Sequence, residues 1–211
     1  MIVVVVGYFV IVVRLSTKEY RDVVDVEDHG VVPVPEEPGH YRASQLGAPR
    51  ALRDLQVVQP DGPSFAVDGW RIRWQKWSLR VGFCPREGLV IHDVRYDDDG
   101  VERRIAHRMS IAELVIPYGD PSPGSYRKNA FDTGEVGVGL YANSLELGCD
   151  CLGEIRYLDV VTNRMDGSPL VIENGICIHE EDDNLLWKHT HWSGRVDRAR
   201  ARRLVISSIA T

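Results

Sequence analysis

Short runs of alternating apolar and polar residues, separated by turn-forming residues, follow one another from residue 65 to the end of the chain. In the first of them, Trp70, Ile72 and Trp74 alternate with Arg71 and Arg73, as in a strand with one buried face. Helical periodicity is scarce. So many short strands joined by turns predict a mainly β protein built as a large sandwich. Further strands are expected at residues 77–83, 88–96, 101–109, 137–141, 155–161, 170–173, 176–179 and 204–208.

Two places in this pattern predict local features of the backbone. The alternation slips by one residue between Trp74 and Trp77, which suggests a β-bulge near Gln75. Residues 97–100, three aspartates followed by a glycine, separate two β-rich runs and predict a hairpin turn. A calcium loop is the alternative there, but the ligand spacing of an EF-hand is absent.

The beginning of the chain differs from the rest. Residues 2–13 are rich in valine and isoleucine, which favours a buried strand, and the run is too short to cross a bilayer as a helix. No lysine or arginine precedes it and no small-residue cleavage site follows it, so we expect no signal peptide and favour a cytoplasmic location. Residues 31–39 contain three prolines and predict an extended linker, with a domain boundary there or slightly later.

The charge balance excludes one class of partner. The formal net charge of −6 gives no electrostatic footprint for nucleic acid, and no membrane partner is expected. The basic cluster at residues 195–203 is interleaved with Asp197 and alanines, which is typical of a solvated turn or strand end. No phosphate-binding loop, dinucleotide fingerprint or serine-hydrolase elbow is present.

A first candidate site lies at residues 131–135, where Asp132 and Glu135 follow Phe131. A carboxylate enclosed by apolar groups has a raised pKa, which suits a general base near neutral pH. The alternative is an aspartate that caps a turn. Tyr118, in the proline-rich loop at 117–124, is either a hydrogen-bond donor to a bound oxygen anion or a packing residue.

Cysteines and histidines form two further candidates. Cys149, Cys151, Cys177 and His179 could present four ligands to zinc from two strands, because alternate strand residues face the same way. A disulfide from one of the first pair to Cys177, or a set of inert buried cysteines, fits the spacing equally well. The pair His189 and His191 would suit copper or zinc, but paired histidines are a weak motif.

Longer strings of residues carry a resemblance to a known family. They are REGLV at 86–90, VIPYGDP at 115–121, RKNAFDTGE at 127–135, NSLELGCDCLG at 143–153, NGICIHEED at 174–182, LWKHT at 186–190 and RRLVIS at 202–207. In order and approximate spacing, from about Asp28 onward, they resemble the copper amine oxidases. The resemblance implies that residues 65–211 are the early part of that family's large catalytic β-sandwich. Residues 1–43 would be the tail of a preceding small α+β domain, with a linker at 44–64.

The resemblance also implies roles for particular residues. Asp132 corresponds to the catalytic base, and Tyr118 to a tyrosine that hydrogen-bonds the quinone oxygen. Cys151 and Cys177 correspond to a disulfide pair. Val136 stands where the family often has a tyrosine near the substrate channel, so it bears on amine preference. The family usually has aspartate in place of His191, and its copper motif lies much further on, so no metal is expected at residues 189–191.

The implied activity is the oxidative deamination of primary amines by O2, which yields aldehyde, ammonia and hydrogen peroxide in a homodimer that contains copper and topaquinone. The quinone-forming tyrosine and the three copper histidines are expected beyond Thr211. This chain alone is therefore expected to bind neither cofactor and to be inactive. The alternative function is a non-catalytic β-sandwich module, with a structural zinc at Cys149, Cys151, Cys177 and His179.

Overall fold

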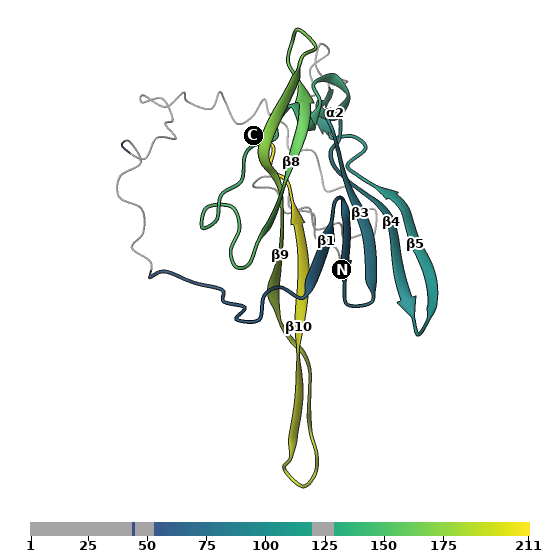
Figure 1. Cartoon of the computed structure of the whole chain (residues 1–211), viewed down its shortest axis with the longest axis vertical. Helices are drawn as coiled ribbons and strands as arrows, with labels where there is room; N and C mark the ends of the chain where they lie inside the picture. Colours follow the sequence, from purple (N-terminus) through teal and green to yellow (C-terminus); the bar gives the residue numbers. More distant parts are fainter. Residues whose placement is uncertain (1–43, 45–52, 120–128) are drawn as a thin grey trace, which may run out of the picture.

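The structure is a computed structural model that describes residue 44 and residues 53–119 and 129–211 (Figure 1). The apolar run at 2–13, the proline-rich linker at 31–39 and the expected domain tail at 1–43 lie outside the described residues, as does most of the proline-rich loop at 117–124. Residues 53–64 contain no helix or strand. Among the described residues, no helix has the length and apolarity needed to span a membrane.

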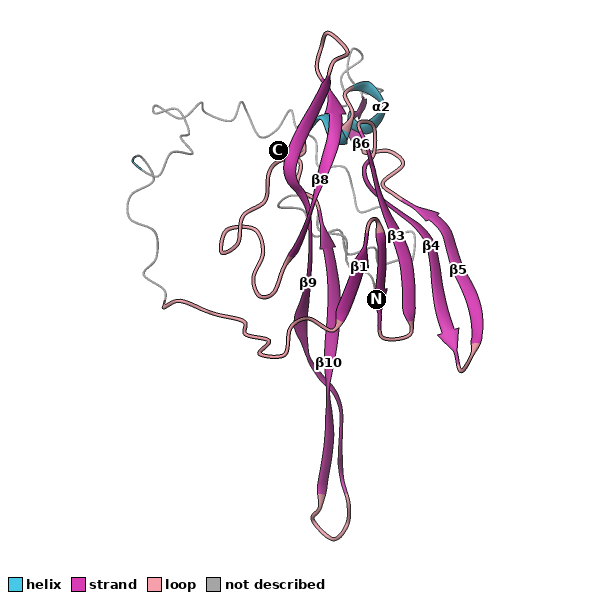
Figure 2. Ribbon diagram, in the orientation of Figure 1, coloured by secondary structure: helices cyan, strands magenta, loops and turns pink. Residues whose placement is uncertain are grey.

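The first sheet is an antiparallel meander of five strands that pair in chain order (Figure 2). Consecutive strands with short turns are neighbours because a short connection returns the chain beside the strand it has just left. The strands are β1 (Phe65–Asp68), β2 (Arg71–Trp74), β3 (Trp77–Cys84), β4 (Gly88–Asp98) and β5 (Val101–Met109).

Two hairpin turns explain the breaks in the sequence pattern. The prediction of a β-bulge near Gln75 is wrong. Trp74 pairs with Trp77, and Gln75, with φ of 52°, begins a two-residue turn between them. Paired residues share a face of the sheet, so a chain reversal here produces the same slip in parity as a bulge. The expected turn at residues 97–100 is confirmed, with Asp98 paired to Val101 and positive φ angles at the two residues between them.

The second sheet has three antiparallel strands in the order β10-β9-β8, namely β8 (Arg156–Asn163), β9 (Pro169–Thr190) and β10 (Val196–Ser207). The two strands expected at 170–173 and 176–179 are one long strand, because a register shift against β8 absorbs the irregularity at Asn174. The outer parts of β9 and β10 project beyond both sheets as a two-stranded arm (Figure 1). The basic cluster at 195–203 lies along β10, where Arg200 pairs with Asp182.

The core lies between the two sheets, so the expected mainly β sandwich is confirmed. Fully buried aliphatic side chains come from both layers, and each contributes ~1.5–3 kcal/mol relative to exposure. The buried residues of this cluster are Phe65, Ile72, Val81, Val160, Ile176 and Ile178. A smaller cluster of Leu145, Cys151 and Cys177 closes one end of the second sheet.

A small third unit stands at the end of the first sheet. It contains the ribbon of β6 (Val115–Pro117) and β7 (Asn129–Phe131), the short helix α2 (Asp132–Glu135) and the 3₁₀ helix η2 (Val138–Tyr141). The prediction of a strand at 137–141 is therefore wrong, because Val138–Tyr141 is a 3₁₀ helix. The amide of Leu140 bonds back to the carbonyl of Gly137, and the amide of Ala142 to that of Gly139, so these residues coil instead of extending.

Candidate active site

The two candidate residues of the active site flank the β6–β7 ribbon. Val115 pairs with Phe131 and Pro117 with Asn129, so Tyr118 follows one end of the ribbon and Asp132 follows the other. The amide of Asp132 donates to the carbonyl of Leu114 at 3.1 Å, which continues the pairing by one step. The register therefore places Tyr118 and Asp132 directly beyond opposite ends of the ribbon.

Both residues are accessible from solvent. Tyr118 is 57% exposed, and Asp132 is half-buried at the first position of α2. The carbonyl of Asp132 accepts the amides of Val136 at 3.3 Å and Gly137 at 3.1 Å, which fixes its backbone. Asp132 thus lies on a turn whose backbone is held by hydrogen bonds.

The turn between β3 and β4 packs against the segment that follows α2. The amide of Val138 donates to the carbonyl of Arg86 at 2.9 Å. Gly139 is buried, and a Cβ atom added to it would stand 2.2 Å from the carbonyl oxygen of Cys84. Only glycine allows such a close approach of two backbones. A Cβ atom added to Gly134 would lie 3.8 Å from the guanidinium of Arg86, so described residues of the motifs at 86–90 and 127–135 are neighbours in space.

Replacing Gly139 by alanine is expected to destabilise the native state by several kcal/mol, because the new Cβ clashes with backbone that cannot rotate away. The comparison variant is Gly167→Ala, where nothing lies within 4 Å of the added Cβ and the expected cost is the strain of a left-handed backbone (φ of 81°), about 1–2 kcal/mol. Chemical denaturation of the two purified variants checks the prediction. Equal unfolding free energies for the two variants would show that the loop at 138–141 does not pack on Cys84 in solution.

An ion pair holds the same turn to β5. The carboxylate of Glu87 accepts from both terminal nitrogens of Arg108 and from the hydroxyl of Ser110 at 3.1 Å. The pKa of Glu87 is lowered to about 2, mainly by the hydrogen bond from Arg108 and less by the one from Ser110. Burial has the opposite effect but is outweighed. Glu87 is therefore ionised across the physiological range and anchors the support of the Asp132 segment.

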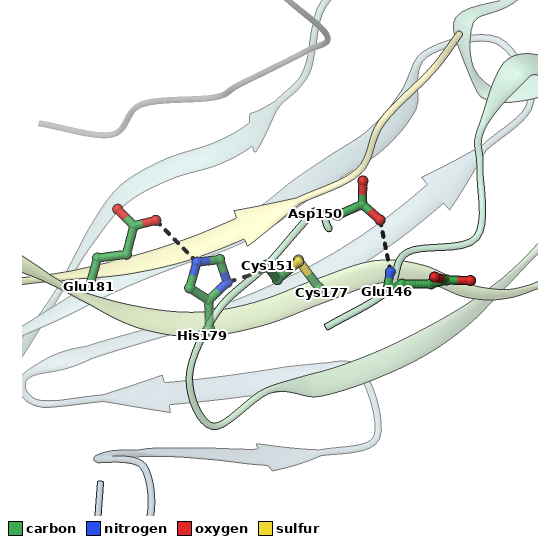
Figure 3. The surroundings of a disulfide bond; sticks show 6 residues. All are labelled: Glu146, Asp150, Cys151, Cys177, His179 and Glu181. Atoms are coloured by element: carbon green, nitrogen blue, oxygen red, sulfur yellow. Dashed lines mark hydrogen bonds and ion pairs between the residues drawn. A yellow bond between two sulfur atoms is a disulfide. The ribbon is translucent and has the colours of Figure 1, made fainter. Parts of the chain in front are cut away.

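The cysteines form a disulfide between Cys151 and Cys177, the pairing that the family resemblance implies (Figure 3). His179 is buried beside it, with Nδ1 3.9 Å from the sulfur of Cys177, and Nε2 donates to Glu181 at 3.1 Å. Cys149 is exposed and is a free thiol. Bonded sulfurs are not thiolate ligands, so the structure does not favour the four-ligand zinc site.

Removing this disulfide with Cys151→Ser and Cys177→Ser is expected to lower the unfolding free energy by about 3 kcal/mol, because the bond closes a loop with a sequence separation of 26. Thermal unfolding of the oxidised protein and the double variant measures the difference. Cys149→Ser is the control and should leave the transition where it is. A double variant that is as stable as the parent would contradict the structural role of the bond.

The histidine pair at 189–191 does not form a site in the structure. His189 lies at the end of β9, opposite Asp197, whereas His191 begins the turn and bonds the hydroxyl of Ser193 at 2.8 Å. Within the described part of the chain, the three potential metal ligands that come close together are Cys151, Cys177 and His179. The cluster of potential metal ligands in this part of the chain therefore does not include His189 or His191.

One residue near Asp132 was missed by the sequence reasoning. Glu113 lies before β6, yet its Oε1 accepts the amides of Thr133 at 2.9 Å and Gly134 at 3.0 Å. Its Oε2 is 3.5 Å from the guanidinium of Arg86. The partners are about twenty residues away in either direction, so no local pattern marks Glu113 as part of this segment.

Fold and site together define a mainly β sandwich with a short ribbon that is followed at one end by a half-buried carboxylate and at the other by an exposed tyrosine. Residues 66–211 match the domain family described as "Copper amine oxidase, enzyme domain". The chain belongs to the copper amine oxidase family, as the resemblance implied.

Individual relatives agree with this assignment. A primary amine oxidase of Arthrobacter sp. (strain P1) is 50% identical over 191 residues, which are 90% of this chain and 30% of that protein. A histamine oxidase of Arthrobacter globiformis is 50% identical over 92% of this chain and 29% of its own length. A solved structure of a copper-containing benzylamine oxidase from Hansenula polymorpha superposes with a TM-score of 0.72 at 42% identity, over 81% of this chain and 27% of that one. The chain thus spans about 30% of the length of its curated relatives.

Proposed function

We propose that this chain supplies the proton-abstracting carboxylate of a primary amine oxidase, with Asp132 as the general base. The observation that supports the proposal is the register of the β6–β7 ribbon, by which Asp132 and Tyr118 directly follow opposite ends of one short two-stranded unit. Ile116 and Ala130 form the central pair of the ribbon, so they share one of its faces, and the side chain of Ala130 is small. An aromatic ring can lie along such a face with a polar group at each end.

Asp132 and Tyr118 have different proposed roles, which follow from the chemistry of a carboxylate and a phenol. When bound, the family's topaquinone supplies the electron sink that makes the α-hydrogen of an amine acidic. The carboxylate of Asp132 then accepts that proton, and the hydroxyl of Tyr118 donates a hydrogen bond to a quinone oxygen. Positioned proton transfer of this kind is typically worth ~10²–10⁴-fold in rate.

The described residues fit the quinone's polar neighbours but not the copper. The cluster of Cys151, Cys177 and His179 has two of its three ligand atoms in a disulfide. On the family resemblance, we propose that the copper ligands and the quinone-forming tyrosine belong to other parts of the full-length enzyme, and that the chain by itself does not oxidise amines. No step of the proposed mechanism in this chain uses copper.

A chimeric oxidase tests the proposal. This chain would replace the aligned segment of the Arthrobacter sp. (strain P1) enzyme, which is 50% identical to it. The expected result is a coloured, quinone-containing protein that releases hydrogen peroxide when a primary amine is added. A chimera that folds and forms its quinone, yet releases no peroxide with any primary amine, would contradict the proposal.

The substrate class and assembly follow the family only in outline. The relatives are named for methylamine, histamine, diamines and N-methylputrescine, so a primary amine is proposed here without a finer choice. Val136, 44% exposed at the end of α2, is the residue we propose to influence amine preference.

We also propose a homodimer, because the arm of β9 and β10 exposes Leu186 and Trp192 to solvent. A cytoplasmic location remains our prediction, although some relatives are named as peroxisomal.

A further inference from the structure

The turn that begins at Asp132 has no cap of its own. The residue before it is Phe131, which has no side-chain oxygen and makes no capping hydrogen bond. The amides at the start of a helical turn have no partner within the turn, so a side chain or water must accept them. Ser, Thr, Asp and Asn are the residues that most often do this from the position before a helix.

Glu113 provides the missing cap from a distant part of the chain. Its Oε1 accepts three amides, from Leu114 at 3.1 Å, Thr133 at 2.9 Å and Gly134 at 3.0 Å. Thr133 and Gly134 are the two residues directly after Asp132. The other oxygen, Oε2, faces the guanidinium of Arg86 at 3.5 Å, which links the cap to the supporting turn between β3 and β4.

Glu113 is an acceptor in its ionised form. Burial raises the pKa of Glu113, but the hydrogen bonds from Gly134, Leu114 and Thr133, together with the charge of Arg86, lower it below its usual value. An ionised carboxylate accepts hydrogen bonds and donates none, so it suits a site where three amides converge.

We propose that Glu113 is a positioning residue for Asp132, and that it works by binding the amides of Thr133 and Gly134. This inference rests on the proposed function of Asp132. Amides that are directed at Glu113 are not available to the carboxylate of Asp132, which would otherwise be the nearest anion to them. The Asp132 side chain is thus left free to face the substrate, and its backbone is held at both ends of the turn. Misplacement of a catalytic group by about 1 Å can cost ~10²-fold in rate.

The test uses the chimeric oxidase with Glu113→Ala and Glu113→Gln. Glutamine retains an oxygen that can accept both amides, whereas alanine removes it. The expected result for Glu113→Ala is a loss of about 10²-fold in the rate at which an amine reduces the quinone without oxygen, with KM changed far less. Glu113→Gln should retain the rate within about tenfold. Glu113→Asp, which withdraws the acceptor by one methylene, should fall between them and serves if the alanine variant does not fold.

A second readout does not depend on the cofactor. Amide hydrogen exchange of the peptide that covers residues 129–137 should speed up in Glu113→Ala and stay near the parent value in Glu113→Gln. Asp93→Asn is the matched control. Asp93 is a carboxylate as exposed as Glu113, and it pairs with Arg95 within β4, away from the turn at Asp132. It should change neither readout.

Two outcomes would overturn the inference. Equal losses in Glu113→Ala and Glu113→Gln would show that the charge, and not the acceptor, matters. Unchanged exchange and unchanged reduction in Glu113→Ala would show that the cap has no role. Failure of the proposed function is distinguishable, because it would appear as undiminished turnover in Asp132→Asn, whatever Glu113 does.

Discussion

Replacing Asp132 by asparagine in the chimeric oxidase is expected to lower kcat for primary amines by about 10²–10⁴-fold and to leave the quinone content unchanged. Asparagine has nearly the shape of aspartate and can occupy the same turn, but its amide cannot accept a proton from carbon. Steady-state peroxide release gives the rate, and titration of the quinone with a hydrazine gives the amount of cofactor. The loss should appear in the anaerobic reduction of the quinone as well.

Glu135→Gln is the control for this variant. Glu135 lies in the same short helix and is exposed, and it is the second carboxylate of the sequence motif. Its replacement should leave turnover within a few-fold of the parent. Turnover of Asp132→Asn within a few-fold of the parent would refute the assignment of the base, and a large loss in Glu135→Gln alone would transfer the role to Glu135.

Replacing Glu180 by alanine is expected to destabilise the protein by about 3–5 kcal/mol. Glu180 is 3% exposed, and its carboxylate accepts the side-chain amide of Gln59 at 2.7 Å, the backbone amide of Ser64 at 2.8 Å and the indole of Trp74 at 2.9 Å. It thereby fastens the segment before β1, the first sheet and the second sheet to one another. Alanine leaves all three donors without an acceptor. Denaturant unfolding of the chimeric oxidase measures the effect.

The stability that Glu180 provides depends on pH in a defined direction. Burial raises the pKa of Glu180, but the hydrogen bonds from Ser64, Trp74 and Gln59 and the charge of Arg202 lower it below the usual value. A lowered native pKa means that the contribution is complete above the unfolded value of about 4.3 and is lost as the pH falls below it. The difference between parent and variant should therefore shrink in acid. Glu173→Ala, an exposed glutamate on the same strand, is the control, and an equal loss in both variants would contradict the account.

The sequence pattern predicted much of the fold because strands with one buried face must alternate. It located most strands of both sheets, and the aspartate–glycine turn at 97–100 followed from backbone chemistry alone. It misread the turn at Gln75 as a bulge, because both produce the same slip in parity and only the pairing of Trp74 with Trp77 distinguishes them. It misread residues 137–141 as a strand because the coil there depends on packing against Cys84, which is distant in sequence.

The site was predicted less completely, and for a different reason. From residue types alone, Asp132 could be a base or a turn cap, and Tyr118 a donor or a packing residue; the family resemblance provided the choice. Glu113 lies in none of the resemblance strings, and Glu180 lies in one of them without a role that the resemblance implies. Their partners lie 20 and 116 residues away, so their roles are set by the way the sheets bring separate segments together.

An experimental structure of the chimeric oxidase, with its quinone trapped by a substrate-like hydrazine, would show where Asp132 lies relative to the reacting atom. We expect a carboxylate oxygen of Asp132 within ~2.6–3.2 Å of the hydrazine nitrogen that replaces the α-carbon of the amine, and the hydroxyl of Tyr118 hydrogen-bonded to a quinone oxygen. A trapped quinone with Asp132 out of hydrogen-bond reach would contradict this expectation.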